Sequence, residues 1–223
     1  MKLTIVAATG GIGRQLLAQS LAAGHEVTAV VRNPSRLDVD VKAVAVDLSD
    51  VNGQSEALRS AVQGADAVLS GLGARTKTDY GVATRGTRAL IEAMDAVGTK
   101  RLVVVSAAPI GTVASPARPN PPRYDEGDGF VMRHVLNPMV KRVLRDHYAD
   151  LATMEDEVRA SRLDWTIIRP PQLTDKPLTG AYRTAYGQNL RGGTKISRAD
   201  VADLMLRSLT MPESGHAVMA LAY

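Results

Sequence analysis

The chain has 223 residues, of which 45% are hydrophobic, enough to bury the core of one large α/β domain. Its formal charge of +4 comes from basic residues that are scattered singly, and it has one Phe and one Trp, which argues against a nucleic-acid-binding surface. The lack of cysteine excludes disulfides and thiol catalysis, and no apolar run approaches the roughly 20 residues of a membrane span. We therefore expect a cytoplasmic protein that binds neither nucleic acid nor membrane.

Short apolar runs alternate with segments of helical spacing along the chain. The predicted strands cover residues 2–8, 26–32, 42–47, 66–72, 101–107 and 164–170. Apolar stripes at helical spacing lie between most of them, for example at Leu90, Ile91, Met94 and Val97. Because the strands are continuously apolar, they favour a doubly wound (Rossmann-like), mainly parallel sheet with helices on both faces.

The second half of the chain interrupts this pattern. Residues 109–129 contain five prolines, which predicts an irregular loop after the fifth strand. A helix is predicted over residues 131–161, with Pro138 at a start or kink and the charged segment 154–159 as a solvated face. Its apolar side comprises Val140, Val143, Leu144, Leu151, Met154 and Val158. The turn-rich segment 171–196 predicts a small substrate-side portion of a single domain, and Ser197 caps the following helix.

A glycine-containing turn follows the first predicted strand. It comprises Ala7, Ala8, Thr9, Gly10, Gly11, Ile12 and Gly13. Between a strand and a helix, such glycines let backbone amides hold the pyrophosphate of a dinucleotide. Ala7 stands where the three-glycine form of this turn has its first glycine, so we expect residue 7 to have an ordinary, negative φ.

Further candidate contacts follow the next strands. Arg32 and Arg36 stand where an acidic residue would bind the ribose of NAD, so they favour the 2′-phosphate of NADP(H). Asp47 and Leu48 close the third strand and are predicted to face the adenine. After the fourth strand, glycines occur where the cofactor backbone would pass, in the segment Gly71, Leu72, Gly73, Ala74 and Arg75.

Together, the segments AATGGIG, VVRNPSRL, VVVSA, DWTIIRPPQLTD, PLTGAY and ISRADVADLMLRSL cover nearly the whole chain. In these the chain resembles the atypical short-chain dehydrogenase/reductase superfamily, in its NmrA-like NAD(P)H-binding branch, and is similar there to the biliverdin-IXβ/NADPH-dependent flavin reductases. The resemblance implies that residues 8–13 hold the pyrophosphate and that Ser106, Pro170 and Pro171 border the nicotinamide. Gln172 replaces the histidine of that subgroup, at a predicted substrate contact.

The acid of this superfamily is absent from its usual motif. Most of its dehydrogenases use Tyr-x-x-x-Lys, in which lysine lowers the pKa of the tyrosine. Tyr148 has roughly the right place, but Ala152 stands where lysine should. The catalytic candidates are therefore Tyr148, as a substrate contact or weak acid, and Ser106, as a hydrogen-bond donor. The four histidines have no metal-ligand spacing, so no metal is expected.

Two functions remain open from the residues. The first is an NADPH-dependent reductase that passes hydride to a planar, conjugated small molecule such as a flavin, quinone or tetrapyrrole, which can take its proton from water. The second is a non-catalytic NmrA-like sensor that binds NADP(H) and signals through a protein partner. The sequence leaves both a monomer and a homodimer open.

Overall fold

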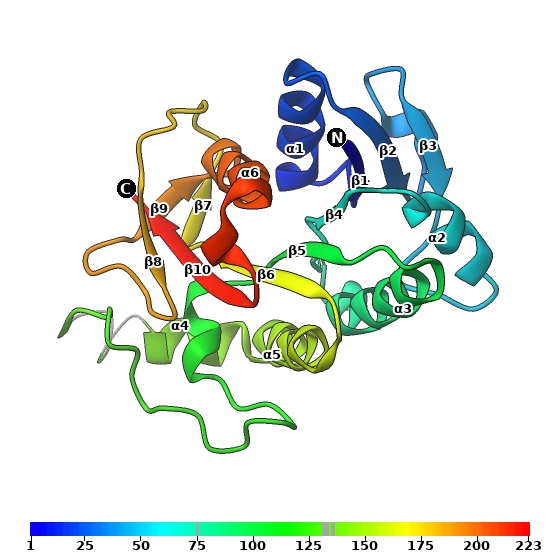
Figure 1. Ribbon diagram of the computed structural model, residues 1–223. Helices are drawn as coiled ribbons and strands as arrows, with labels where there is room; N and C mark the ends of the chain where they lie inside the picture. Colours follow the sequence, from blue (N-terminus) through cyan, green and yellow to red (C-terminus); the bar gives the residue numbers. More distant parts are fainter. Residues whose placement is uncertain (75, 131–133, 135–136) are drawn as a thin grey trace.

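The structure is a computed structural model that describes residues 1–74, 76–130, 134 and 137–223 (Figure 1). Among these residues, eight strands form one sheet in the order β3-β2-β1-β4-β5-β6-β10-β8. Neighbouring strands are parallel except β8, which is antiparallel to β10. The strands are β1 (Lys2–Val6), β2 (Glu26–Val31), β3 (Lys42–Ala45), β4 (Ala67–Ser70), β5 (Arg101–Val105), β6 (Asp164–Arg169), β8 (Arg183–Tyr186) and β10 (Ala217–Ala222). The doubly wound α/β fold is confirmed, and the strand order reverses between β1 and β4.

Helices cover both faces of the sheet (Figure 1). On one face lie α1 (Gly11–Ala22) and α6 (Arg198–Arg207), and on the other lie α2 (Ser55–Val62), α3 (Val82–Val97) and α5 (Arg145–Ala160). Each face has its own buried core, which contains Leu16 and Met205 on the first side and Leu90 and Met154 on the second. Short 3₁₀ turns connect these elements: η1 (Pro34–Arg36), η2 (Lys77–Asp79), η3 (Ala108–Thr112), η5 (Ser208–Thr210) and η6 (Pro212–Ser214).

The helical segment after the proline-rich loop is divided, which corrects the prediction of one helix. The described part comprises α4 (Asn137–Val143) and α5, separated at Leu144, whose φ of −106° and ψ of 26° are not helical. Leu151 and Val158 are buried as predicted, but the side chain of Val143 is 74% exposed. The predicted apolar side is wrong at Val143 because the helical spacing is not continued across the break.

The segment from residue 171 to 196 forms the part of the molecule beside β10. The strands β7 (Gln172–Thr174) and β9 (Lys195–Ser197) pair as a separate two-stranded parallel sheet, while β8 extends the main sheet. Ser197 caps α6 as predicted, because its side chain accepts a hydrogen bond from the backbone N–H of Asp200. Within the described residues, no helix is long and apolar enough to cross a membrane.

Candidate functional site

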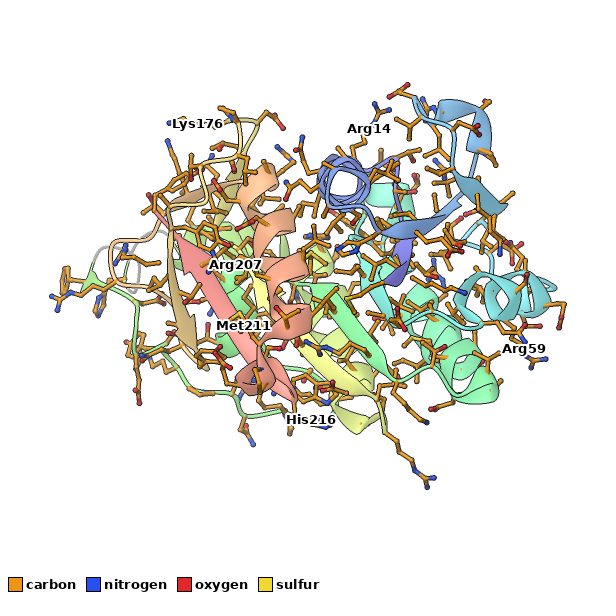
Figure 2. All side chains as sticks on the ribbon, turned by 45° about the horizontal axis from the view of Figure 1, so that its top comes forward. Arg14, Arg59, Lys176, Arg207, Met211 and His216 are labelled. Atoms are coloured by element: carbon orange, nitrogen blue, oxygen red, sulfur yellow. The ribbon has the colours of Figure 1, made fainter. Side chains whose placement is uncertain are left out.

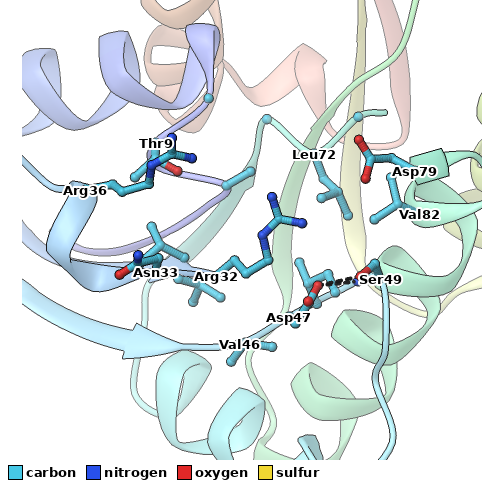
Figure 3. A pocket seen from close by; sticks show the side chains of 17 residues that line it. Thr9, Arg32, Asn33, Arg36, Val46, Asp47, Ser49, Leu72, Asp79 and Val82 are labelled. Atoms are coloured by element: carbon cyan, nitrogen blue, oxygen red, sulfur yellow. Dashed lines mark hydrogen bonds between the residues drawn. The ribbon is translucent and has the colours of Figure 1, made fainter. Parts of the chain in front are cut away.

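A groove runs along the carboxyl ends of β1, β2, β3 and β4, where open α/β sheets bind ligands. Figure 3 shows that it is walled by side chains from separate strand ends. It brings together many of the residues predicted to bind the cofactor: Thr9, Gly10, Arg32, Arg36, Asp47, Leu48, Gly71, Leu72 and Gly73. Asn33, Ser49 and Asp79 line it too, and sequence reasoning missed them.

The glycine turn differs from the prediction at its first residue. Ala7 has a φ of +59°, in the left-handed region, so the expected negative φ is wrong. The turn imposes this conformation because the Ala7 N–H donates to the Val30 carbonyl at 3.0 Å while its carbonyl accepts from the Gly10 N–H at 2.8 Å. The methyl group of alanine is accommodated there at a cost in backbone strain.

The turn also explains why Gly13 is a glycine. A Cβ atom at Gly13 would lie 2.1 Å from the Ala7 carbonyl oxygen, so any other residue would force the strand and helix apart. A Cβ at Gly71, at the end of β4, would lie 3.3 Å from the Gly13 nitrogen. Gly13, in the first turn of α1, and Gly71, directly after β4, therefore pack closely because neither has a side chain.

The start of α1 suits a negatively charged ligand. Gly10 is its N-cap and receives no side-chain hydrogen bond within the described part of the chain, and the first turn of α1 has no acidic residue. The groove reaches this helix end at Thr9 and Gly10, where the first amides of a helix and the positive end of its dipole favour a negative charge. These features fit an anionic group such as the pyrophosphate of a dinucleotide.

Arginines and a carboxylate stand opposite this turn. In Figure 3 the guanidinium of Arg36 lies beside Thr9, and that of Arg32 extends into the middle of the groove. The Asp47 carboxylate accepts from the Ser49 backbone N–H at 3.0 Å and from its hydroxyl at 2.6 Å. The Ser49 hydrogen bonds, with a smaller contribution from the charge of Arg32, lower the pKa of Asp47 below its usual value. Asp47 is therefore ionised at neutral pH and can only accept hydrogen bonds.

A second cavity, of about 430 Å³, lies at the carboxyl ends of β5 and β6. Its walls are mostly apolar, and it contains Tyr148 and the predicted residues Pro170, Pro171 and Gln172. Tyr148 is 7% exposed, and burial raises the pKa of its phenol, so this group stays protonated. Ala152, one helical turn later, is buried in the core on this side of the sheet.

Ser106 is placed differently from the expectation. It lies at the end of β5, is 6% exposed, and is not among the residues that line the second cavity. Its hydroxyl donates to Glu155 Oε1 at 2.7 Å. Since that proton is already used, Ser106 cannot act as the predicted hydrogen-bond donor while this bond stands, and only its lone pairs remain for a ligand.

Glu155 itself corrects the reading of residues 154–159 as a solvated face. It is 1% exposed and accepts from Arg169 Nε at 2.8 Å and Nη2 at 2.5 Å, and from Arg159 at 3.1 Å. Burial alone would raise the pKa of Glu155, but the hydrogen bonds and charge of Arg169 outweigh it, so the pKa is lowered. A signal was available in the sequence, because Glu155 stands four residues after Leu151 and three before Val158, on the buried stripe.

The sequence is similar to those of known nucleotide-binding proteins. A family model described as NAD(P)H-binding matches residues 7–212. The chain belongs to this NAD(P)H-binding family. It is 29% identical to "Uncharacterized sugar epimerase YhfK" of Bacillus subtilis, over 94% of this chain and 88% of that protein. It is 36% identical to the "3-diazoavenalumate denitrifying reductase" of a Streptomyces species, over 98% of this chain and 66% of that protein.

Solved structures show the same fold. The anaerobillin reductase ChuY of Escherichia coli O157:H7 superposes on this NAD(P)H-binding protein with a TM-score of 0.76 at 22% identity, covering 100% of this chain and 97% of the other. The family match confirms the predicted nicotinamide dinucleotide cofactor and the resemblance to NAD(P)H-binding proteins. Among the predicted contacts, Ala8 and Ile12 are buried within the turn, and Arg75 lies outside the described residues. Within the described part, no cluster of residues could hold a metal ion.

Proposed function

We propose that the protein is an NADPH-dependent oxidoreductase that transfers hydride to a planar, conjugated acceptor such as a flavin, a quinone or a tetrapyrrole. The apolar cavity at the ends of β5 and β6 carries this proposal, because its volume and walls suit a flat, largely apolar molecule. It lies at the same edge of the sheet as the groove, so one extended dinucleotide could occupy the groove and present its nicotinamide at the cavity.

The groove would hold the adenosine end of the cofactor. Residues 8–13 would bind the pyrophosphate, Arg32 and Arg36 the 2′-phosphate, and Asp47 the amino group of the adenine. A guanidinium recognises a phosphate through charge-assisted, bidentate hydrogen bonds, and both arginines line the groove. Their placement is the observation that favours NADPH over NADH.

At the other end, the chain would mainly orient the reactants. The cofactor, when bound, supplies the hydride. Pro170 and Pro171 offer rigid, flat walls, and the neutral phenol of Tyr148 and the amide of Gln172 can donate hydrogen bonds to oxygen or nitrogen atoms of the acceptor. A conjugated acceptor delocalises the incoming electron pair and takes its proton from water, so it does not require the lysine that Ala152 replaces.

Two of the similar proteins have names that fit this proposal. One is named as a reductase of 3-diazoavenalumate and the other as a reductase of anaerobillin. Reduction is the reaction class that these names share with the proposal. The rival function, a redox sensor without turnover, would use the same groove but would have no need of an acceptor in the apolar cavity.

The test is oxidation of NADPH in the presence of a panel of acceptors that includes FMN, several quinones and a linear tetrapyrrole. The loss of NADPH absorbance monitors the reaction. We expect at least one acceptor to show saturable turnover. The matched control is the variant Ala108→Trp, which would fill the cavity with an indole while leaving the groove unchanged. Saturable NADPH binding without turnover of any acceptor would refute the reductase and favour the sensor.

A further inference from the structure

The side chain of Arg198 lies across the start of α1. Arg198 is the first residue of α6, which packs beside α1 on the same face of the sheet. A Cβ atom added to Gly11 would lie 2.6 Å from Arg198 Cδ and 2.7 Å from its Nε. The place that a side chain at residue 11 would occupy is therefore filled by an arginine from the far end of the sequence.

The charge of Arg198 is held by an exposed partner. Its Nη1 lies 2.6 Å from Oδ1 of Asp175, directly after β7, and the Arg198 and Asp175 side chains are 30% and 88% exposed. An ion pair this exposed contributes little free energy, because water screens it and competes for both groups. Arg198 can therefore exchange Asp175 for another anion at small cost.

We propose that Arg198 is a further cofactor-binding residue, whose guanidinium leaves Asp175 and binds the pyrophosphate of NAD(P)H at the start of α1. The inference rests on the proposed placement of the pyrophosphate at residues 8–13. Two phosphate charges there would attract a guanidinium whose Nε lies 2.7 Å from the Cβ position of Gly11, and a planar guanidinium binds phosphate oxygens in a bidentate manner. Arg14, in the first turn of α1, differs in that its Nε also donates to the Thr9 carbonyl at 3.2 Å, which ties its guanidinium to the backbone of the turn.

This role differs from that of Arg32 in what it recognises. The pyrophosphate is common to NADPH and NADH, so Arg198 would strengthen the binding of both, whereas the 2′-phosphate is present in NADPH alone. Asp175 would act as a competitor for the guanidinium. Removing the arginine and removing the aspartate should therefore change the affinity in opposite directions, which a purely structural ion pair would not do.

The experiment is titration of the full-length protein with NADPH and with NADH, monitored by the fluorescence of the reduced nicotinamide. For Arg198→Gln we expect both affinities to fall by about tenfold, the loss of one charge-assisted contact. For Asp175→Asn we expect both to rise by about twofold to fivefold, as expected for release from an exposed ion pair. The double variant should bind like Arg198→Gln alone, since Asp175 acts only through Arg198.

The control variant is Arg59→Gln, which removes an arginine from α2. In Figure 2, Arg59 lies on the opposite side of the molecule from Lys176, which follows Asp175 in the sequence. It should leave both affinities unchanged. Thermal unfolding checks that each variant is folded, and Arg198→Lys, which keeps the charge, should retain part of the affinity. Unchanged binding by Arg198→Gln, or weaker binding by Asp175→Asn, would overturn the inference. Binding that follows these expectations with no turnover of any acceptor would instead overturn the proposed reductase alone.

Discussion

The groove at β1 to β4 and the cavity at β5 and β6 are built from different kinds of structure. The groove is made of backbone turns and of single polar side chains that each follow a strand, such as Arg32 and Asp47. The cavity is made of residues that lie far apart in sequence, from Ala107 to Ala222, and it adjoins the buried ion pair of Glu155 and Arg169. The groove is therefore specified locally, and the cavity is specified by tertiary packing.

This difference matters for the proposed function because the groove would bind the cofactor and the cavity would bind the acceptor. The pyrophosphate is common to NADPH and NADH, so a local motif suffices to bind it. In the proposed function the acceptor would occupy the cavity, whose shape depends on loops and on a supporting network that no short motif encodes. Substitutions in the buried network of Glu155 and Arg169 and in the groove can show which of the two contributes more to stability and which contributes more to binding.

The largest effect should come from Glu155→Gln, which changes the buried network of Glu155 with Ser106, Arg159 and Arg169. The substitution leaves the Arg169 guanidinium buried without its charged partner, and breaking a buried ion pair in this way costs about 3–5 kcal/mol in the free energy of unfolding. Urea denaturation measures this loss. Glu157→Gln, two residues later on the same helix, removes the half-exposed partner of Arg88 and should cost about 1 kcal/mol or less. Equal losses in the two variants would contradict the buried role of Glu155.

The same pair predicts a pH dependence. The pKa of Glu155 is lowered in the folded protein, so the carboxylate contributes stability above its unfolded pKa of about 4.3 and loses that contribution as the pH falls through the folded value. Denaturation curves between neutral pH and pH values below about 4 should therefore show a steeper acid loss in the wild type than in Glu155→Gln. Parallel curves would mean that Glu155 does not titrate with folding.

The groove is tested by Arg32→Ala. If its guanidinium binds the 2′-phosphate, the affinity for NADPH should fall by about 10-fold to 100-fold, the loss of a bidentate charged contact. The affinity for NADH, which lacks that phosphate, should change little and is the control within one protein. Fluorescence titration measures both. Equal losses for NADPH and NADH would show that Arg32 does not read the 2′-phosphate.

Sequence reasoning succeeded where a feature depends on neighbouring residues. The six predicted strands, the Ser197 cap and the clustering of Thr9, Arg32, Asp47 and Gly71 follow from continuous apolar runs and from the rule that parallel strands end at one edge. It failed where partners come from distant segments. Glu155 looks solvated beside its charged neighbours, and only the fold places Arg169 against it. The covering of Gly11 by Arg198 depends on α1 and α6 being adjacent, which no local pattern states.

A smaller effect is expected at the cavity, from Tyr148→Phe. Burial raises the pKa of this phenol, so it remains neutral at neutral pH and can orient an acceptor without needing to ionise. With a conjugated acceptor that takes its proton from water, kcat should fall by less than about tenfold, whereas removing a true general acid costs about 10²-fold to 10⁴-fold. Steady-state kinetics with an acceptor identified by the panel assay measures this change in kcat. Tyr186→Phe, on β8 outside this cavity, is the control.

The smallest effect concerns Ala7, the residue at which the turn departs from the three-glycine template. Its φ of +59° is unfavourable for alanine by about 1–2 kcal/mol, and Ala7→Gly would remove that strain. Glycine also gains conformational freedom in the unfolded chain, which opposes the benefit by about 0.5–1 kcal/mol. We therefore expect a net stabilisation of between zero and about 1.5 kcal/mol, measured by urea denaturation.

The matched control for Ala7→Gly is Ala23→Gly, because Ala23 is exposed and has a φ of −83°. With no strain to relieve, this change should destabilise the protein by up to about 1 kcal/mol. Opposite signs in the two variants would show that the strain at Ala7 is real, and a loss at both would show that the turn relaxes to fit its alanine. Ala7 contacts Gly10 and Gly13 through its backbone carbonyl, which glycine also has. The substitution should therefore leave the affinity for NADPH nearly unchanged, so that stability and binding can be separated within one turn.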